Sequence, residues 1–174
     1  MANTSLVLTV LGVDRPGLVE SIARVVAEHG GNWIESRMAH LAGHFAGILR
    51  VEVESSKSER LAAALRALGD AGLESLVHPD VAPGAADRPP LVRLELVGQD
   101  RPGIVREISR VLAAQSVNVE ELQTECVPGA ESGVSLFRAQ AMLRLPAGVS
   151  EASLRTALES VAADLMVDLD LESD

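Results

Sequence analysis

The chain has 174 residues, of which 47% are hydrophobic and 23% charged, a composition typical of a globular protein and unlike that of a disordered or collagen-like chain. Its 25 acidic and 15 basic residues give a net charge of −10, which opposes direct binding to nucleic acid, and two Phe, one Trp and no Tyr are too few for base stacking. The single cysteine, Cys126, excludes an internal disulfide framework and a multi-cysteine metal site.

The N-terminal segment carries no basic region of the kind that begins a secretion signal. Its apolar run, Leu6 to Leu11, is too short to span a bilayer. We therefore expect a cytoplasmic protein with no membrane partner, and a single cysteine suits that reducing compartment.

The first half of the chain predicts a strand, a helix, a hairpin, a second helix and a last strand. A β-rich run ends at Gly12, after which apolar residues recur at helical spacing until the breaker pair Gly30 and Gly31. Two extended runs joined by a short turn and a leucine stripe follow. The expected elements are 5–12, 19–29, 33–41, 45–53, 58–68 and 73–79.

The second half repeats this order. Residues 12–35 and 98–121 align without a gap at an offset of 86, and 12 of these 24 positions are identical, so the chain is a duplication. Its expected elements are 91–97, 104–114, 117–126, 134–145, 154–161 and 166–171. Three prolines in residues 80–90 predict a linker, which gives domains at 1–80 and 91–174 joined by 81–90.

The order β-α-β-β-α-β in each copy predicts an α+β protein of two ferredoxin-like domains, each with a four-stranded antiparallel sheet and both helices on one face. In the first strand, residues 6–11 are apolar on both faces, which predicts a second covering layer. The other repeat, another chain, or a loop over a central strand each remain possible covers.

A four-residue motif occurs twice, each time between a strand and a helix. The residues are Asp14, Arg15, Pro16 and Gly17 in the first copy, and Asp100, Arg101, Pro102 and Gly103 in the second. Asp as the N-cap and Pro in the first turn would explain the motif by helix capping alone. Gly, however, is a poor helix former, which suggests that a ligand approaches the backbone there. The free N–H groups at a helix start attract a carboxylate by ~0.3–1 kcal/mol.

Asn32 and Asn118 occupy matching positions where the first helix of each copy gives way to the second strand. An asparagine offers one acceptor and two donors, which suits both the ammonium and the carboxylate of an amino acid. A structural role is equally consistent with the pattern, because Asn tolerates left-handed backbone after a helix.

The repeated pattern G-x-D-R-P-G-[LI]-V, followed by I-x-R-[VL]-[VL]-A and then Asn, resembles the ACT domain, a small ligand-binding regulatory module. A chain of two such domains is similar to the glycine cleavage system transcriptional repressor family and related ACT-only regulators. The resemblance implies side-by-side or face-to-face association, as in a homodimer, with an amino acid bound near the first strand-to-helix loop. The ligand-facing residues would be Asp14 to Gly17 with Asn32, and Asp100 to Gly103 with Asn118.

Catalytic and metal-binding patterns are weak in this sequence. His40 and His44 flank a predicted turn, but no third ligand accompanies them, and Cys126 has no neighbouring group that would activate its thiol. The chain contains no nucleophile elbow, phosphate-binding loop or HExxH helix. We therefore expect no enzyme activity, no cofactor and no metal.

Two hypotheses follow. In the first, a small amino acid held by the repeated loop biases association with a partner protein, a regulator or a metabolic enzyme, with the transcriptional control of glycine metabolism as the output. In the second, the chain is a non-sensing interaction subunit of a metabolic enzyme, which it contacts through the uncovered face of the first sheet.

Overall fold

A computed structural model of the chain describes residues 2–80, 91–129 and 134–173. These residues form two compact units, Met1–Gly84 and Ala85–Asp174, which we call the first unit and the second unit. The predicted linker, residues 81–90, lies outside the described residues, so the domain boundaries stay a prediction.

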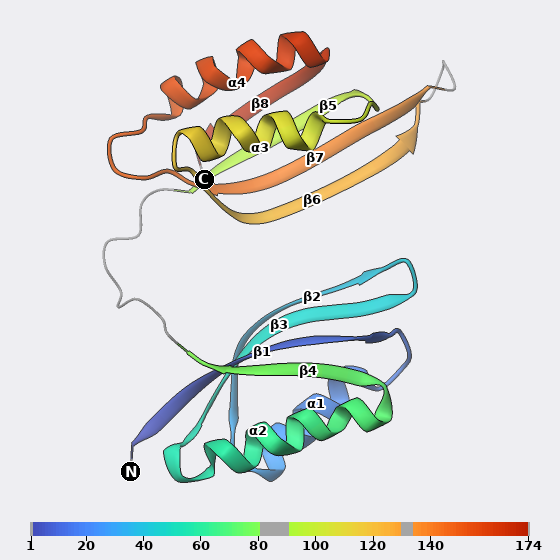
Figure 1. Ribbon diagram of the computed structural model, residues 1–174, viewed down its shortest axis with the longest axis vertical. Helices are drawn as coiled ribbons and strands as arrows, with labels where there is room; N and C mark the ends of the chain where they lie inside the picture. Colours follow the sequence, from blue (N-terminus) through green and yellow to red (C-terminus); the bar gives the residue numbers. More distant parts are fainter. Residues whose placement is uncertain (1, 81–90, 130–133, 174) are drawn as a thin grey trace. The chain divides into compact units, whose positions relative to one another are not determined.

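Each unit contains four strands and two α-helices in the predicted order (Figure 1). The elements of the first unit are β1 (Asn3–Val13), α1 (Leu18–Glu28), β2 (Asn32–Leu41), β3 (His44–Glu54), α2 (Ser58–Arg66) and β4 (Leu73–Pro79). Those of the second unit are β5 (Leu91–Gln99), α3 (Ile104–Ala114), β6 (Asn118–Pro128), β7 (Ser135–Arg144), α4 (Glu151–Leu165) and β8 (Val167–Ser173).

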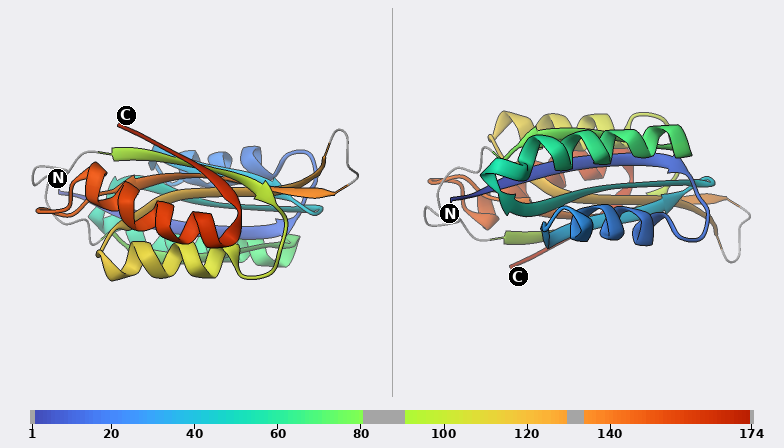
Figure 2. Two further views of the ribbon diagram at one scale, coloured as in Figure 1. Left: turned by 90° about the horizontal axis from the view of Figure 1, so that it is seen from above. Right: turned by 90° about the horizontal axis from the view of Figure 1, so that it is seen from below.

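The two sheets have the same topology. Strand order is β2-β3-β1-β4 in the first unit and β6-β7-β5-β8 in the second, and every neighbouring pair is antiparallel. In each unit both helices lie side by side on one face of the sheet (Figures 1 and 2). The predicted ferredoxin-like fold is therefore confirmed for both copies.

Along the central strand of each sheet, successive side chains point to opposite faces, and this alternation determines which of them form the core. In β1, Leu6, Leu8 and Val10 are buried against the helices, where Ile22 of α1 and Leu61 of α2 are fully buried. The second unit repeats this arrangement with its own cluster of apolar residues. Burial of this helix-facing layer supplies the main stabilisation of each unit.

The opposite face, which we call the free face of each sheet, behaves differently. On β1, Leu11 is 47% exposed, although it lies next to the buried Val10. Ile48 of β3 and Leu76 of β4 lie on the same face and are 48% and 65% exposed. Of the apolar run that predicted a covering layer, Leu11 thus lies at the surface of the described first unit, whereas Leu6, Leu8 and Val10 belong to the core under the helices.

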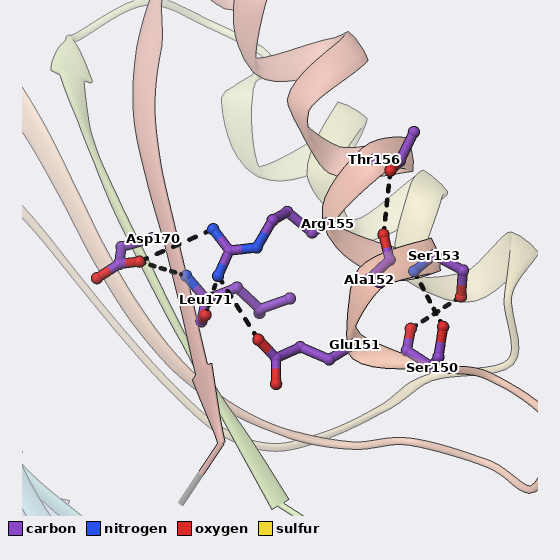
Figure 3. Close-up of polar contacts among 8 residues, drawn as sticks. All are labelled: Ser150, Glu151, Ala152, Ser153, Arg155, Thr156, Asp170 and Leu171. Atoms are coloured by element: carbon purple, nitrogen blue, oxygen red, sulfur yellow. Dashed lines mark hydrogen bonds and ion pairs between the residues drawn. The ribbon is translucent and has the colours of Figure 1, made fainter.

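Helix α4 shows how one element is held in place by polar contacts (Figure 3). The hydroxyl of Ser150 accepts a hydrogen bond of 3.1 Å from the Ser153 backbone N–H, which satisfies a free donor at the helix start. One turn on, Arg155 donates to the Leu171 carbonyl of β8 and lies 3.6 Å from Glu151. These contacts tie the helix to the edge strand of its sheet.

Candidate functional site

The repeated loop caps its helix in a way that the sequence did not predict. Helix α1 begins at Leu18 and not in the motif, and its N-cap is Gly17, in a left-handed conformation with φ 91°. No side chain caps this helix, and the same holds for α3, where Gly103 has φ 101°. The expectation that Asp14 and Asp100 act as N-caps, with Pro16 and Pro102 in the first helical turn, is therefore wrong.

The aspartates instead end the first strand of each unit. The backbone N–H of Asp14 donates to the Gly43 carbonyl in the β2–β3 turn at 2.9 Å, and that of Asp100 donates to the Ser135 carbonyl at the same distance. This contact extends the strand pairing past β1 and β5. The chain then has three residues in which to reach the helix, which a left-handed glycine makes possible.

Open space borders the capping glycines. A Cβ atom placed on Gly17 or Gly103 would meet no other atom of the described chain within 4 Å. The need for glycine therefore comes from the positive φ and not from crowding. A small ligand has room to approach the backbone at both helix starts, as the sequence suggested for a different reason.

The first glycine of the repeated motif has the opposite role. A Cβ on Gly12 would lie 2.6 Å from the Gly72 carbonyl oxygen, and one on Gly98 would lie 2.8 Å from the Val167 Cα. The backbone of the neighbouring edge strand thus passes too close for any side chain. This glycine positions the loop by packing and leaves no space for a ligand.

The charged side chains of the first loop already have partners. Arg15 donates through Nη2 to the Ala71 carbonyl at 2.7 Å, across 56 residues of sequence. Asp14 Oδ2 lies 3.7 Å from His40 Nε2 at the end of β2, and both side chains are about half exposed. The loop is therefore held by long-range contacts to two other parts of its unit.

The second loop has an equivalent pair. Cys126 on β6 faces Phe137 as His40 faces Phe45, so the two residues occupy matching places in the sheet. Partial desolvation raises the pKa of the Cys126 thiol, and the charge and hydrogen bond of Asp100 raise it further. A donor from the edge strand thus accompanies the loop aspartate in both units. Sequence reasoning missed this pair. Asp100 lies 86 residues after Asp14, and Cys126 lies 86 residues after His40, which is the offset of the duplication.

The predicted asparagines lie far from the loops of their own units. Asn32 pairs with Glu52, which pairs with Ser5 at the start of β1, whereas Asp14 follows Val13 at its end. Eight residue steps along β1 correspond to about 27 Å, much longer than an amino acid. One unit cannot bring its loop and its asparagine to a single small ligand.

The second unit has the same separation, because Asn118 pairs with Arg144 opposite Leu91, the first residue of β5. The Asn118 amide donates to Glu120 Oε1 at 2.8 Å, and Arg144 Nε donates to the same oxygen at 2.9 Å. This asparagine therefore has a local structural partner in addition to any ligand.

The histidines considered as metal ligands do not converge. His44 Nδ1 lies 3.2 Å from the Ala42 carbonyl, while His40 contacts Asp14. Among the described residues no group of three or more His, Cys, Asp or Glu side chains is placed to hold a metal ion. None of the helices in the described part of the chain is both long and apolar enough to cross a bilayer.

Comparison with known proteins places this geometry in a family. Residues 4–73 match the family model of the ACT domain. A crystal structure of an unknown protein from Galdieria sulphuraria has a TM-score of 0.85 at 30% identity and covers 99% of both chains. Residues 4–73 thus form an ACT domain, and because the second unit repeats their motif and topology, the chain is similar to a tandem ACT-domain protein.

Particular relatives are regulators by name. The chain is 27% identical over 163 residues to the glycine cleavage system transcriptional repressor of Escherichia coli K12, covering 92% of this chain and 85% of the relative. The crystal structure of a protein proposed to be such a repressor has a TM-score of 0.74 at 20% identity and covers 100% of this chain and 99% of that one. At that identity the second likeness shows the fold alone.

Proposed function

We propose that this chain is a non-catalytic regulator that binds a small amino-acid-type ligand at the loops Asp14–Gly17 and Asp100–Gly103 and thereby modulates a partner protein. One observation carries the proposal: each loop presents a glycine-capped helix start beside open space. The free N–H groups and the helix dipole at such a start favour a carboxylate.

The distance between loop and asparagine adds a condition. Because about 27 Å separates them within a unit, a ligand that contacts both must take the loop from one copy and the asparagine from another. The homodimer that we expect supplies residues from different copies of the chain. Asn32 and Asn118 of one chain then complete sites that the loops of the other chain begin.

The output that we propose is control of gene expression through a protein partner in the cytoplasm. The relative that matches 92% of this chain is named as a transcriptional repressor of the glycine cleavage system, which makes glycine the first ligand to test. The net charge of −10 opposes direct contact with DNA. A ligand shifts the equilibrium between the free and the partner-bound protein only by the difference in its affinity for these two states.

A thermal-shift panel of free amino acids on the full chain tests the sensor role. A ligand at 100 times its Kd stabilises the native state by ~2.7 kcal/mol, which raises the melting temperature by several degrees. The shift should shrink in Asn32→Ala and Asn118→Ala and persist in Asn3→Ala, an exposed asparagine at the start of β1. No shift with any amino acid at millimolar concentration removes the sensor role.

A non-sensing interaction subunit is the second candidate. The exposed apolar side chains on the free face of the first unit, Leu11, Ile48 and Leu76, favour it. A metabolic enzyme that co-purifies with the chain, and that is retained in Asn32→Ala and Asn118→Ala but lost in Ile48→Asp, supports this role. Loss of the complex in the asparagine variants supports the sensor.

A further inference from the structure

Each sheet ends on one side in a long edge strand, β2 in the first unit and β6 in the second. β6 has 11 residues, all of them exposed except Val127, and most of the 10 residues of β2 are exposed as well. The outward N–H and C=O groups of an edge strand have no strand partner in their own sheet. A long exposed edge is therefore a template for pairing with a strand of another chain.

Apolar side chains border both of these edges. Helix α1 packs beside β2, and Val19 of α1 and Ile34 of β2 are 48% and 37% exposed. Helix α3 lies beside β6, and Val105 of α3 and Leu122 of β6 are 44% and 50% exposed. Val105 is the equivalent of Val19, 86 residues later, so both copies of the unit keep an exposed valine in the helix next to the edge. Apolar surface gathered at one place favours association.

The two helices at these edges carry opposite net charges. In α1 two acids surround one base, which gives −1, with the residues Glu20, Arg24 and Glu28. In α3 two bases surround one acid, which gives +1, with the residues Arg106, Glu107 and Arg110. Arg24 lies 3.6 Å from Glu20, and Arg106 lies 2.7 Å from Glu107. Glu20 and Arg106 are equivalent positions of the duplication, so the sign of the charge is reversed at this place.

The edge strands also differ in charge. β6 has no base and three acids, Glu120, Glu121 and Glu125. Like charges on adjacent strands are destabilising, so β6 is unsuited to pair with a second β6. β2 carries one acid and one base, Glu35 and the exposed Arg37, and it presents no such barrier to β6. The edge of each unit thus matches the edge of the other kind of unit better than its own.

We propose that two copies of the chain associate edge to edge, with β2 of the first unit in one copy antiparallel to β6 of the second unit in the other. A two-fold axis makes this contact twice, so that both exposed edges of both copies are paired. In each contact the negative α1 lies beside the positive α3 of the other copy. The inference rests on the homodimer assumed in the proposed function and names the surfaces that form it.

Antiparallel pairing also meets the condition that the loop and the asparagine come from different copies. Asn32 begins β2, so it lies beside the far end of β6 in the other copy, where Pro128 pairs with Ser135. The Ser135 carbonyl accepts the hydrogen bond from Asp100 of the second loop. Asn118 begins β6 and lies at the corresponding end of β2 in the second contact.

A charge swap on the full chain tests which units pair. Sedimentation equilibrium should show a dimer. Glu20→Arg changes the net charge of α1 to +1 and Arg106→Glu changes that of α3 to −1, and each should raise the dimer Kd roughly tenfold at low salt because repulsion replaces attraction in both contacts. The double variant has opposite charges again and should regain the parental Kd. Glu59→Arg on α2, which packs beside β4 at the other edge, is the matched control and should leave the Kd unchanged.

A cross-link locates the contact. Cys126, the single cysteine, is exposed near the end of β6. Ile34→Cys places a second thiol near the start of β2, so a short bismaleimide should join the two positions between chains and give a covalent dimer on a denaturing gel. Glu74→Cys, on the opposite edge strand β4, should give no covalent dimer.

The outcomes separate this inference from the proposed function. A restored dimer in the double variant, together with a cross-link between chains, supports the pairing of unlike units. A dimer that remains weakened in the double variant pairs like units and overturns the inference. A chain that stays monomeric, or a cross-link within one chain, overturns it too. Thermal stabilisation of such a monomer by an amino acid keeps the sensor role, whereas a dimer that binds no amino acid removes only the sensor role.

Discussion

The free faces of the two sheets carry different chemistry on the same backbone. In the first unit Ile48 and Leu76 flank the centre of β1, whereas Gln140 and Asp170 flank the same place on β5 in the second unit. Gln140 donates to Glu95 at 3.2 Å across the second sheet. Duplication preserved the helix-facing core and changed the free face, because folding requires only that one face be buried. The free faces of the two units therefore suit contacts of different chemistry, apolar in the first unit and polar in the second.

The largest expected effect on stability comes from shortening a core-facing side chain of β1, compared with the same change on its free face. Leu8→Ala removes a side chain with 0% exposure and should lower the free energy of unfolding of the first unit by about 2–5 kcal/mol. Leu11→Ala, the matched variant on the free face, should cost about 0.5 kcal/mol or less. Chemical denaturation of the full chain measures both. An equal cost would mean that another surface covers the free face, contrary to its exposure here.

Substitution of the capping glycines has the next largest effect. Gly17→Ala and Gly103→Ala force an alanine into φ near 91° and 101°, which should cost about 1–2 kcal/mol each. Gly69→Ala is the control, because this glycine has no positive φ and a Cβ there meets open space. Thermal unfolding checks the difference. Similar stability of all three variants would show that the left-handed cap is not required.

Removal of a helix cap should have a smaller effect. Ser150→Ala leaves the Ser153 backbone N–H without its side-chain acceptor and should cost about 1 kcal/mol. Helix α2 of the first unit has no side-chain cap, so α4 alone of this pair depends on such a contact. Ser160→Ala, in the middle of α4, should leave the unfolding midpoint within error of the parent. A loss at Ser160 equal to that at Ser150 would contradict the capping role.

The smallest effect concerns the loop aspartates. Because Asp100 contributes to the raised pKa of Cys126, Asp100→Asn should lower this pKa and speed the reaction of the thiol with a disulfide reagent a few-fold at pH 8. The stability linked to the raised pKa is fully present below the ordinary value of 9.0 and is lost as the pH rises through the folded value. Asp14→Asn, the same change beside His40, should leave the thiol rate unchanged. Equal acceleration by both variants would refute the contact between Asp100 and Cys126.

The spacing of apolar residues was sufficient to predict the fold. Helix α3 was expected at residues 104–114 and is found at Ile104–Ala114, because an apolar stripe at helical spacing buries one face in any compact arrangement. The β2–β3 hairpin was expected at its turn residues, and Ala42 and Gly43 both adopt the positive φ that such a turn requires. Local pattern and tertiary packing agree at these elements.

The candidate site was predicted only in part. The capping preference of aspartate favoured Asp14 as the helix cap, but the hydrogen bond from its N–H to the Gly43 carbonyl holds this residue directly after β1, and the cap is Gly17. The separation of loop and asparagine depends on strand register, which the sequence pattern did not specify to within one residue. Whether the loops and asparagines bind a ligand stays a prediction.

By itself the sequence determined that the chain is duplicated, that each copy alternates strands and helices in one order, and which residues face the core, because these properties follow from local periodicity. Only the tertiary structure decided that Asp14 meets His40, that Asn32 lies a full strand length from its own loop, and that β6 is an exposed edge strand of its sheet. These features depend on distances between residues far apart in the chain, and such distances are set by register and packing volume.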